Sequence, residues 1–145
     1  MPSINRSALV AYSAEQMFQL VDDISAYPEF LPWCGGAEEH KRDESQVEAS
    51  VTIQKGAINK AFTTQNRLNK PGLIELRLLD GPFKKLQGFW RFDALSENAC
   101  KVTFDLEFEF SNRIVGLAIG PIFNQVANTF VDSFVERAKV VYGNH

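Results

Sequence analysis

Residues 100–110 read CKVTFDLEFEF, and this stretch decides the fold class of the chain. Its apolar side chains, from Cys100 to Phe110, alternate strictly with polar ones, and a period of two residues is typical of a β-strand. Alternation sustained over the whole stretch predicts one buried face and one wet face, as in an antiparallel sheet. The apolar face of this strand therefore needs a separate layer of structure to cover it.

Further strand patterns precede this stretch. Turn residues separate them, namely Gly56, the sequence NKPG at 69–72, and Gly81-Pro82. Short turns between successive strands predict hairpins, so we expect an antiparallel sheet of about seven strands. The other segments with strand character are 3–10, 47–54, 58–68, 73–79 and 86–92.

Helical periodicity begins after the first strand. Ser13 and Gln16 have the spacing of a capping box, and an apolar stripe from Met17 to Ile24 follows. Pro28 ends this pattern, and residues 27–31 are expected to form one further helical turn. Two short helices should therefore follow the first strand.

A second helical pattern covers residues 112–142, and Gly143 is its expected end. Gly116, Gly120 and Pro121 weaken its first third, so we expect a short helix, a break or kink, and a regular helix from Pro121 onward. One long helix is available to cover one apolar sheet face. The predicted fold class is α+β, with a curved antiparallel sheet wrapped around a long C-terminal helix.

Length and composition indicate one domain that spans residues 1–145. The hydrophobic content of 45% is ordinary for a globular protein, and twelve Phe suit a dry, wide interior. Two Cys and two His form no zinc-binding pattern, so no metal is expected, and free thiols indicate a reducing compartment. We find neither a signal-peptide pattern nor an apolar run near the ~20 residues of a membrane span. We expect a cytoplasmic protein, with peripheral contact at the inner membrane left open.

Charge is unevenly distributed along the chain. The formal net charge of −3 gives no simple reason to expect a nucleic acid partner, but residues 51–91 carry eight Lys and Arg against only Glu75 and Asp80. A basic sheet face attracts RNA phosphates or anionic lipid headgroups. The alternative is that these cations pair with acidic neighbours on adjacent strands. The candidates for contact with RNA are Lys55, Arg67, Lys70, Arg77, Lys84, Lys85 and Arg91.

Residues 22–34, DDISAYPEFLPWC, bring two prolines and several aromatic side chains into one short connection. A solvated loop does not normally carry such side chains together, so we expect them to fold onto an apolar opening of the domain. The alternative is an ordinary loop packed over the sheet edge. The predicted lid consists of Tyr27, Phe30, Leu31, Pro32 and Trp33.

Apolar side chains that face the sheet and the helix are the candidates for a ligand-binding tunnel. One helix cannot fill a wide curved sheet, and ligand sites are typically apolar with few polar anchors. The alternative is that these residues pack only on one another. Lys60 and Thr64, which share parity with Phe62, are candidate polar anchors. The candidate tunnel residues are Phe62, Leu76, Leu78, Trp90, Phe92, Phe104, Leu106, Phe108, Phe123, Val126, Phe130 and Phe134.

Catalytic residues are not expected. The carboxylates Asp105, Glu107 and Glu109 lie on the wet face of their strand, where pairing with Arg77 or Arg91 is their expected role. No general base is placed inside, and we find no nucleophile motif and no nucleotide-binding motif. The residues alone favour binding of an apolar molecule over its chemical conversion.

Four segments carry a resemblance that covers essentially the whole chain: YSAEQMFQLVDDISAYPEFLPWC at 12–34, GPFKKLQGFWRF at 81–92, VTFDLEFEF at 102–110 and VDSFVERAKVVYG at 131–143. They resemble the coenzyme Q-binding and ribosome-association-toxin (RatA) family of the START-like superfamily, which is also described as the polyketide cyclase/dehydrase and lipid transport superfamily. The resemblance implies a helix-grip fold with an apolar tunnel between sheet and helix. Gly120-Pro121 departs from the family pattern, in which the last helix continues, and this affects one end of the tunnel.

The resemblance implies two functions. Mitochondrial members bind ubiquinone and support respiration, whereas some bacterial members are toxins that bind the large ribosomal subunit and block subunit joining and translation initiation. Without a transit peptide, the chain resembles a bacterial member. We expect a non-enzymatic protein that holds a polyisoprenoid quinone such as ubiquinone, or a similar lipid, as its ligand and needs no other cofactor. The alternative is a ribosome-association toxin of the same fold, and a cyclase-like enzyme is a third reading that rests on fold analogy alone.

Overall fold

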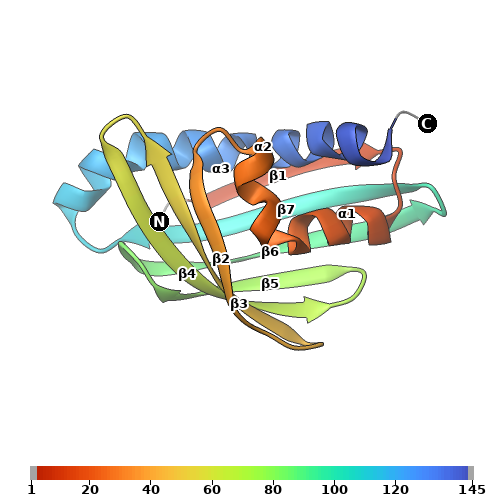
Figure 1. Ribbon diagram of the computed structural model, residues 1–145, viewed down its shortest axis with the longest axis horizontal. Helices are drawn as coiled ribbons and strands as arrows, with labels where there is room; N and C mark the ends of the chain where they lie inside the picture. The colour runs from red at the N-terminus through yellow and green to blue at the C-terminus, as the bar shows by residue number, and fades with distance from the viewer. Residues whose placement is uncertain (1–2, 144–145) are drawn as a thin grey trace.

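The computed structural model describes residues 3–143, and its core is a single curved sheet with a long helix along one face (Figure 1). In this part of the chain the strands are β1 (Ser3–Val10), β2 (Cys34–Arg42), β3 (Gln46–Lys55), β4 (Ile58–Asn69), β5 (Leu73–Asp80), β6 (Phe83–Ser96) and β7 (Ala99–Phe110). The helices are α1 (Ala14–Asp22), a 3₁₀ turn η1 (Ile24–Ala26), α2 (Tyr27–Phe30) and α3 (Arg113–Tyr142). The predicted α+β class, the antiparallel sheet and the two short helices after β1 are confirmed.

Antiparallel pairing holds throughout the sheet, whose order is β1-β7-β6-β5-β4-β3-β2. Each strand from β2 to β7 pairs with its neighbour in sequence, and β1 completes the sheet beside β7. α1 packs against β6, β7 and α3, so it covers the inward face of the sheet next to one end of α3. The expected capping box is present at its start, because Gln16 N donates to Ser13 Oγ at 3.1 Å and Ser13 N donates to Gln16 Oε1 at 2.9 Å.

The sequence patterns did not predict the position of β2. Its sequence, CGGAEEHKR, has no apolar alternation, and most of its side chains are exposed or half-buried. β2 is an edge strand that pairs only with β3, so both of its faces tolerate polar side chains. Pairing with β3, rather than burial of its own side chains, makes this segment a strand.

α3 runs without a break from Arg113 to Tyr142, so the expected break near Pro121 is wrong. Phe110 explains how the first third stays in place, because Gly116 and Gly120 approach its ring closely. A Cβ atom built on these glycines would lie 3.4 and 3.6 Å from ring carbons of Phe110. Pro121 is exposed, and the helix ends at Gly143, whose φ is +80°. By length and composition α3 is also apolar enough to cross a membrane, which the sequence reading did not expect, but core helices of soluble proteins pass the same test.

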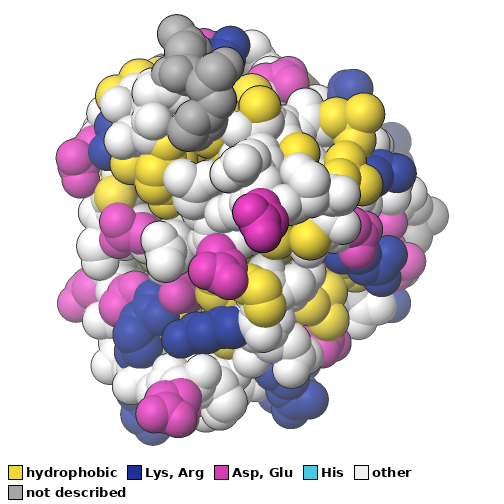
Figure 2. Space-filling view, turned by 90° about the vertical axis from the view of Figure 1, so that its right-hand side faces the viewer, with side chains coloured by type: hydrophobic (Ala, Val, Ile, Leu, Met, Phe, Trp, Pro, Cys, Tyr) yellow, Lys and Arg dark blue, Asp and Glu magenta, His cyan; other side chains and the backbone are white. Residues whose placement is uncertain are grey.

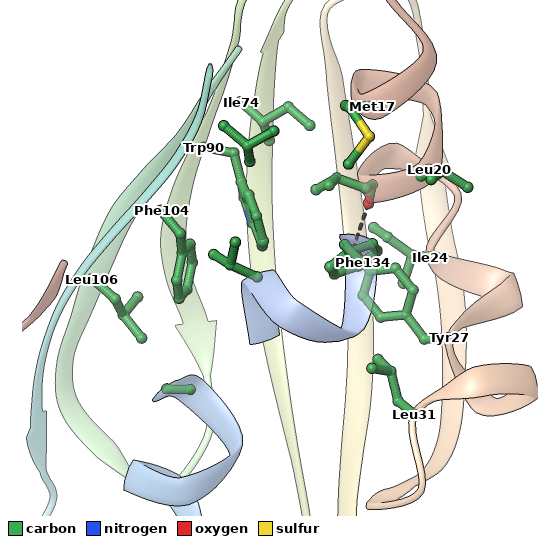
Figure 3. Packing of buried hydrophobic residues seen from close by; sticks show 14 of the residues in the cluster. Met17, Leu20, Ile24, Tyr27, Leu31, Ile74, Trp90, Phe104, Leu106 and Phe134 are labelled. Carbon is green, nitrogen blue, oxygen red and sulfur yellow. Dashed lines mark hydrogen bonds between the residues drawn. The ribbon is translucent and has the colours of Figure 1, made fainter. Parts of the chain in front are cut away.

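The hydrophobic core lies between the inward face of the sheet, α3 and the two short helices (Figure 3). Met17 and Ile24 reach it from the α1 side, and Trp90 and Phe104 reach it from the sheet. Phe134 of α3 lies next to Tyr27 in this view, so the core joins the long helix to the connection that follows α1. The middle of the sheet is thus faced by α3 together with this connection.

Candidate functional site

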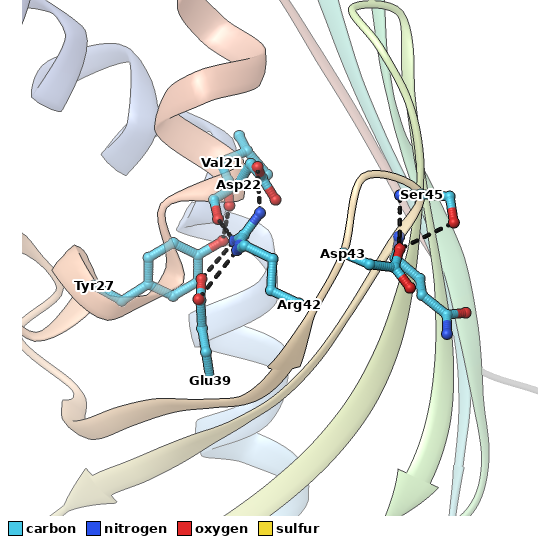
Figure 4. A network of polar contacts seen from close by, with 8 residues as sticks. Val21, Asp22, Tyr27, Glu39, Arg42, Asp43 and Ser45 are labelled. Carbon is cyan, nitrogen blue, oxygen red and sulfur yellow. Dashed lines mark hydrogen bonds and ion pairs between the residues drawn. The ribbon is translucent and has the colours of Figure 1, made fainter.

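The connection between α1 and β2 is fastened by a polar network (Figure 4). The Tyr27 hydroxyl donates to the Val21 carbonyl oxygen, and burial raises the pKa of this hydroxyl. Arg42 of β2 donates to the Asp22 carboxylate and to the Asp22 carbonyl oxygen, each at 2.9 Å, and pairs with Glu39. The hydrogen bond from Arg42 lowers the pKa of the Glu39 carboxyl. The network therefore holds the end of α1 and the start of α2 against β2.

Aromatic contacts hold the same connection against α3. The Tyr27 and Phe30 rings meet the Phe134 ring with centroids 5.4 and 5.3 Å apart, and Trp33 lies 5.7 Å from Phe130. Of the five residues predicted as a lid, Tyr27, Leu31 and Trp33 are buried, Phe30 is half-buried and Pro32 is exposed. The connection thus closes one side of the space between sheet and helix, and its role as a ligand lid stays a prediction.

An apolar cavity of about 80 Å³ lies between the middle of the sheet and α3. Eight residues of the predicted tunnel line it, together with Tyr27 and Trp33 of the predicted lid. Those eight are Phe62, Leu76, Trp90, Phe104, Leu106, Phe123, Val126 and Phe130. The remaining lining is mostly aliphatic, from Ile24, Ala49, Val51, Ile53, Leu86 and Ala127. Whether these residues bind a ligand stays a prediction.

Four predicted tunnel residues do not line this cavity, and their neighbours explain why. Phe92 meets Phe18 of α1 at 5.7 Å, because α1 covers that end of the sheet. Phe108 meets Phe123 at 4.7 Å, and Phe134 is enclosed by the α2 aromatics. The fourth, Leu78, is half-buried beside the turn at Gly81. Packed core, rather than a tunnel, occupies both ends of the inward sheet face.

Polar groups are sparse on the cavity wall. Thr64, one of the two expected anchors, lines the cavity, whereas Lys60 is exposed near the start of β4 and does not line it. Sequence reasoning missed Asn66, which is 7% exposed and accepts a hydrogen bond from the Thr64 hydroxyl at 2.8 Å. Asn66 lies four residues after Phe62 on β4, so alternation alone would have placed both side chains on the inward face. Trp33 is also buried, and its Nε1 has no hydrogen-bond partner.

Groups suited to acid–base chemistry are missing from this wall. Within residues 3–143, no Asp, Glu, His, Lys, Arg or Cys lines the cavity. The hydroxyl of Tyr27 is already engaged with a carbonyl oxygen, and its raised pKa disfavours ionisation. The two free cysteines, Cys34 and Cys100, are buried, and burial raises the pKa of each thiol. The wall is therefore suited to hold an apolar molecule rather than to transfer protons to it.

A second, outer groove of about 250 Å³ lies on the other side of Trp33. Trp33 and Val126 line both the groove and the cavity, so they form the wall between them. Lys55 reaches over the groove, where its Nζ donates to Gln125 Oε1 at 2.8 Å. The other residues of the groove are Pro32, Thr129 and Ser133.

The outward face of the sheet carries a hollow of about 460 Å³ over β4 to β7. Arg67 and Arg77 line it together with the acidic side chains of Glu75, Asp105 and Glu107. In the described part of the chain neither arginine forms an ion pair, although Arg67 lies opposite Glu75 in the sheet register. This face therefore offers free guanidinium groups in a mixed electrostatic environment.

The expected pairing of the β7 carboxylates with Arg77 or Arg91 is wrong, because neither arginine forms an ion pair in the described residues. Glu107 approaches Lys85 at 3.9 Å rather than Arg77, and Asp105 accepts a hydrogen bond from Asn5 at 2.9 Å. Arg91, expected as a partner, instead lies over the Phe89 ring, 4.9 Å from its centroid. Arg91 pairs with Thr103 in the sheet register, which puts it beyond these carboxylates along the strand.

The seven candidate basic residues do not form one patch. Lys55 lies by the outer groove near α3, whereas Lys70 lies beside α1 and Pro71. All are exposed except Lys85, which is half-buried. At the end of the molecule seen in Figure 2, acidic and basic side chains are interspersed and hydrophobic ones form small separate groups. An RNA contact would therefore use a subset of the seven.

Comparison with known proteins places the chain in a family. A family model for polyketide cyclase, dehydrase and lipid transport proteins matches residues 10–135. The ribosome association toxin RatA of Vibrio cholerae serotype O1 is 50% identical over 143 residues, which cover 99% of this chain and 99% of that protein. The chain belongs to the RatA family. The resemblance carried by the four sequence segments is thus confirmed.

The RatA family is related more distantly to coenzyme Q-binding proteins. The mitochondrial coenzyme Q-binding protein COQ10 of Drosophila melanogaster is 26% identical over 138 residues, covering 92% of this chain and 57% of that protein. The crystal structure of a START superfamily protein from Mycobacterium smegmatis gives a TM-score of 0.77 at 19% identity and covers 93% of this chain and 95% of that one, which shows the shared fold. The identity to RatA is about twice that to COQ10, and RatA matches over its full length.

Proposed function

We propose that this protein associates with the ribosome, as a toxin of the RatA type that binds the large subunit and blocks subunit joining and translation initiation. The 50% identity to RatA across 99% of both chains carries this proposal. The sequence alone favoured quinone binding as the main function and ribosome association as the alternative, and this proposal reverses that ranking. The absence of acid–base groups on the cavity wall supports a binding rather than an enzymatic role, and the ribosome implies a cytoplasmic location.

Exposed cations that form no ion pair are the groups best suited to contact ribosomal RNA. Lys84 is exposed and unpaired in the described residues, and the adjacent Lys85 holds Glu107 only at 3.9 Å. Phosphate contacts by such side chains release counterions, so binding should weaken steeply as salt is raised. A chain with net charge −3 needs such local contacts, because its overall charge repels RNA.

Sedimentation with purified ribosomal subunits tests this function. The protein should sediment with the large subunit at low salt and be released as salt rises. Lys84→Glu combined with Lys85→Glu should weaken the association about tenfold or more, because two phosphate contacts turn repulsive. Lys41→Glu combined with Lys101→Glu is the control, since it changes the net charge equally at exposed positions outside the candidate set. Failure of the unaltered protein to sediment would refute the function, and equal effects of the two double variants would refute the Lys84–Lys85 surface.

A second candidate function, binding of a polyisoprenoid quinone or similar lipid, is favoured by the apolar cavity. Its volume of about 80 Å³ is smaller than the ~150 Å³ of a cavity known to hold benzene and than the ~300–1,000 Å³ of typical ligand pockets. A ligand would therefore require the wall at Trp33 to move. Each methylene of an isoprenoid tail that leaves water contributes about 0.8 kcal/mol, which drives such an opening.

Native mass spectrometry of gently purified protein tests the second function. A stoichiometric quinone mass, identified after organic extraction, would support it. A ligand-free mass that added ubiquinone leaves unchanged would contradict it, and ribosome association would then stand alone. Quenching of Trp33 fluorescence by added quinone is the corresponding solution measurement, with Trp33→Phe as its control.

A further inference from the structure

Two side chains at the cavity wall, Trp33 and Asn66, carry N–H donors that have no acceptor within residues 3–143. Trp33 is 8% exposed, and its Nε1 has no hydrogen-bond partner. Asn66 is 7% exposed, and the only hydrogen bond of its side chain in the described residues is the one that Oδ1 accepts from Thr64. Native proteins keep few buried polar groups without partners, because a buried donor that has left water without finding an acceptor is destabilising. The buried indole nitrogen of Trp33 therefore requires an explanation, and the amide nitrogen of Asn66 is a second donor without a partner on the same small cavity.

Thr64 determines which part of the Asn66 side chain remains available. Its hydroxyl donates to Asn66 Oδ1 at 2.8 Å, so the amide oxygen is satisfied and the amide nitrogen is not. A carboxamide nitrogen and an indole nitrogen both donate and do not accept. The cavity wall therefore presents two hydrogen-bond donors to a ligand, the indole nitrogen of Trp33 and the amide nitrogen of Asn66.

The chemistry of the wall selects one class of ligand. No cation lines the described cavity, so a carboxylate or phosphate would be buried without a counter-charge. A pure hydrocarbon would leave both donors unsatisfied. We propose that Trp33 and Asn66 donate hydrogen bonds to the carbonyl oxygens of a neutral, apolar ring compound that occupies the cavity. This inference rests on the second proposed function, binding of an apolar ligand.

Space for such a ring becomes available through Trp33 itself. The indole and Val126 separate the cavity of about 80 Å³ from the outer groove of about 250 Å³. If the indole swings aside, the two spaces join and reach the lower end of the ~300–1,000 Å³ range of ligand pockets. The same movement frees Nε1, which has almost no accessible surface while the wall is closed. Trp33 thus both admits the ring and binds it.

A matched pair of compounds tests the donors. 2,3-Dimethyl-1,4-naphthoquinone and 2,3-dimethylnaphthalene share one carbon skeleton and differ in two carbonyl oxygens. The affinity of the full chain for each is measured by equilibrium dialysis, and the readout is the ratio of the two affinities. Trp33→Phe and Asn66→Leu should each reduce this ratio about 2- to 10-fold, the value of one net hydrogen bond. Phe130→Leu, which alters the apolar wall without removing a donor, should change both affinities alike.

The outcomes separate this inference from the function on which it rests. An unchanged ratio in both donor variants would overturn the inference, even if both compounds bind. Binding of the hydrocarbon but not of the quinone would also overturn it, while leaving apolar ligand binding in place. Binding of neither compound to the unaltered protein would remove both. Retained hydrocarbon binding in Trp33→Phe and Asn66→Leu shows that the variants are folded.

Discussion

Truncation of two phenylalanines one helical turn apart on α3 tests the division of the inward sheet face into packed core and cavity. Phe134 is 0% exposed and its ring meets those of Tyr27 and Trp90 at 5.4 and 5.3 Å. Replacing a packed Phe with Ala costs about 3–5 kcal/mol, and Phe134→Ala should lose that amount. Phe130 lines the cavity, so part of its ring already lacks neighbours. Phe130→Ala should cost about 3 kcal/mol or less, at or below the low end of that range, because the side of the ring that faces the cavity loses no neighbours.

Urea unfolding followed by far-UV circular dichroism measures both losses. The two variants should show the same dependence of the free energy of unfolding on urea, so that midpoints report stability alone. A loss of ~3–5 kcal/mol is large against the ~5–15 kcal/mol of a typical domain, and Phe134→Ala should remain folded but marginal. If Phe130→Ala costs as much as Phe134→Ala, the cavity beside Phe130 is filled in solution and the reasoning fails.

Three further predictions follow from single positions. Gly88→Ala should destabilise the protein by about 2 kcal/mol or more, because the added Cβ would lie 2.1 Å from the Asp105 carbonyl oxygen. Thermal melts measure this loss. Gly72→Ala is the control, since the atom nearest to its added Cβ lies 3.9 Å away. Burial raises the pKa of the Cys100 thiol from 9.0 to about 11. Below pH 9 the thiol is protonated in both the folded and the unfolded chain, and its contribution to the stability of the fold is complete. As the pH rises from 9 to 11 the unfolded chain releases the proton first, so this contribution is lost. Cys100→Ala should therefore lose less stability over this interval, by on the order of 2 kcal/mol, and an identical pH profile would contradict the burial argument. Arg42→Met should raise the pKa of the Glu39 carboxyl toward its ordinary value in a carboxyl NMR titration, since the hydrogen bond from Arg42 is the main cause of its lowering; no change would disprove that cause.

Local patterns were enough to predict the elements whose own side chains make the core. β7 alternates because its inward face is buried along its length, and Ser13 and Gln16 cap α1 as their spacing predicted. β2 escaped prediction because its stability comes from hydrogen bonds to β3, which leave no period in its sequence. α3 continues through Pro121, and Phe110 of β7 packs on Gly116 and Gly120 just before it; helical propensity does not include such a contact between separate elements.

The candidate site shows a similar limit. Parity placed Phe104 and Phe108 on the same inward face of β7, but only Phe104 lines the cavity. The difference depends on where α3 places Phe123, whose ring meets Phe108 at 4.7 Å, and alternation along one strand cannot report that position. Asn66 was missed because β4 is polar on both faces, so an inward amide did not stand out. Alternation along a strand predicts which residues point inward, whereas the packing of α3 determines which of those residues line the cavity.

The two proposed functions use different parts of the molecule and can therefore be separated. Ribosome association requires exposed cations such as Lys84, whereas ligand binding uses Trp33 and Asn66, which are at least nine-tenths buried. Asn66→Leu replaces one buried side chain by another of similar size and leaves the outward sheet face unchanged, so sedimentation with ribosomes should persist while discrimination between quinone and hydrocarbon falls. The Lys84→Glu and Lys85→Glu double variant should give the opposite pattern. If either variant lost both ligand binding and ribosome association while its unfolding midpoint stayed the same, the two sites would be coupled. Trp33 and Asn66 are buried and Lys84 is exposed, so such coupling would require a conformational equilibrium that both the ligand and the ribosome shift.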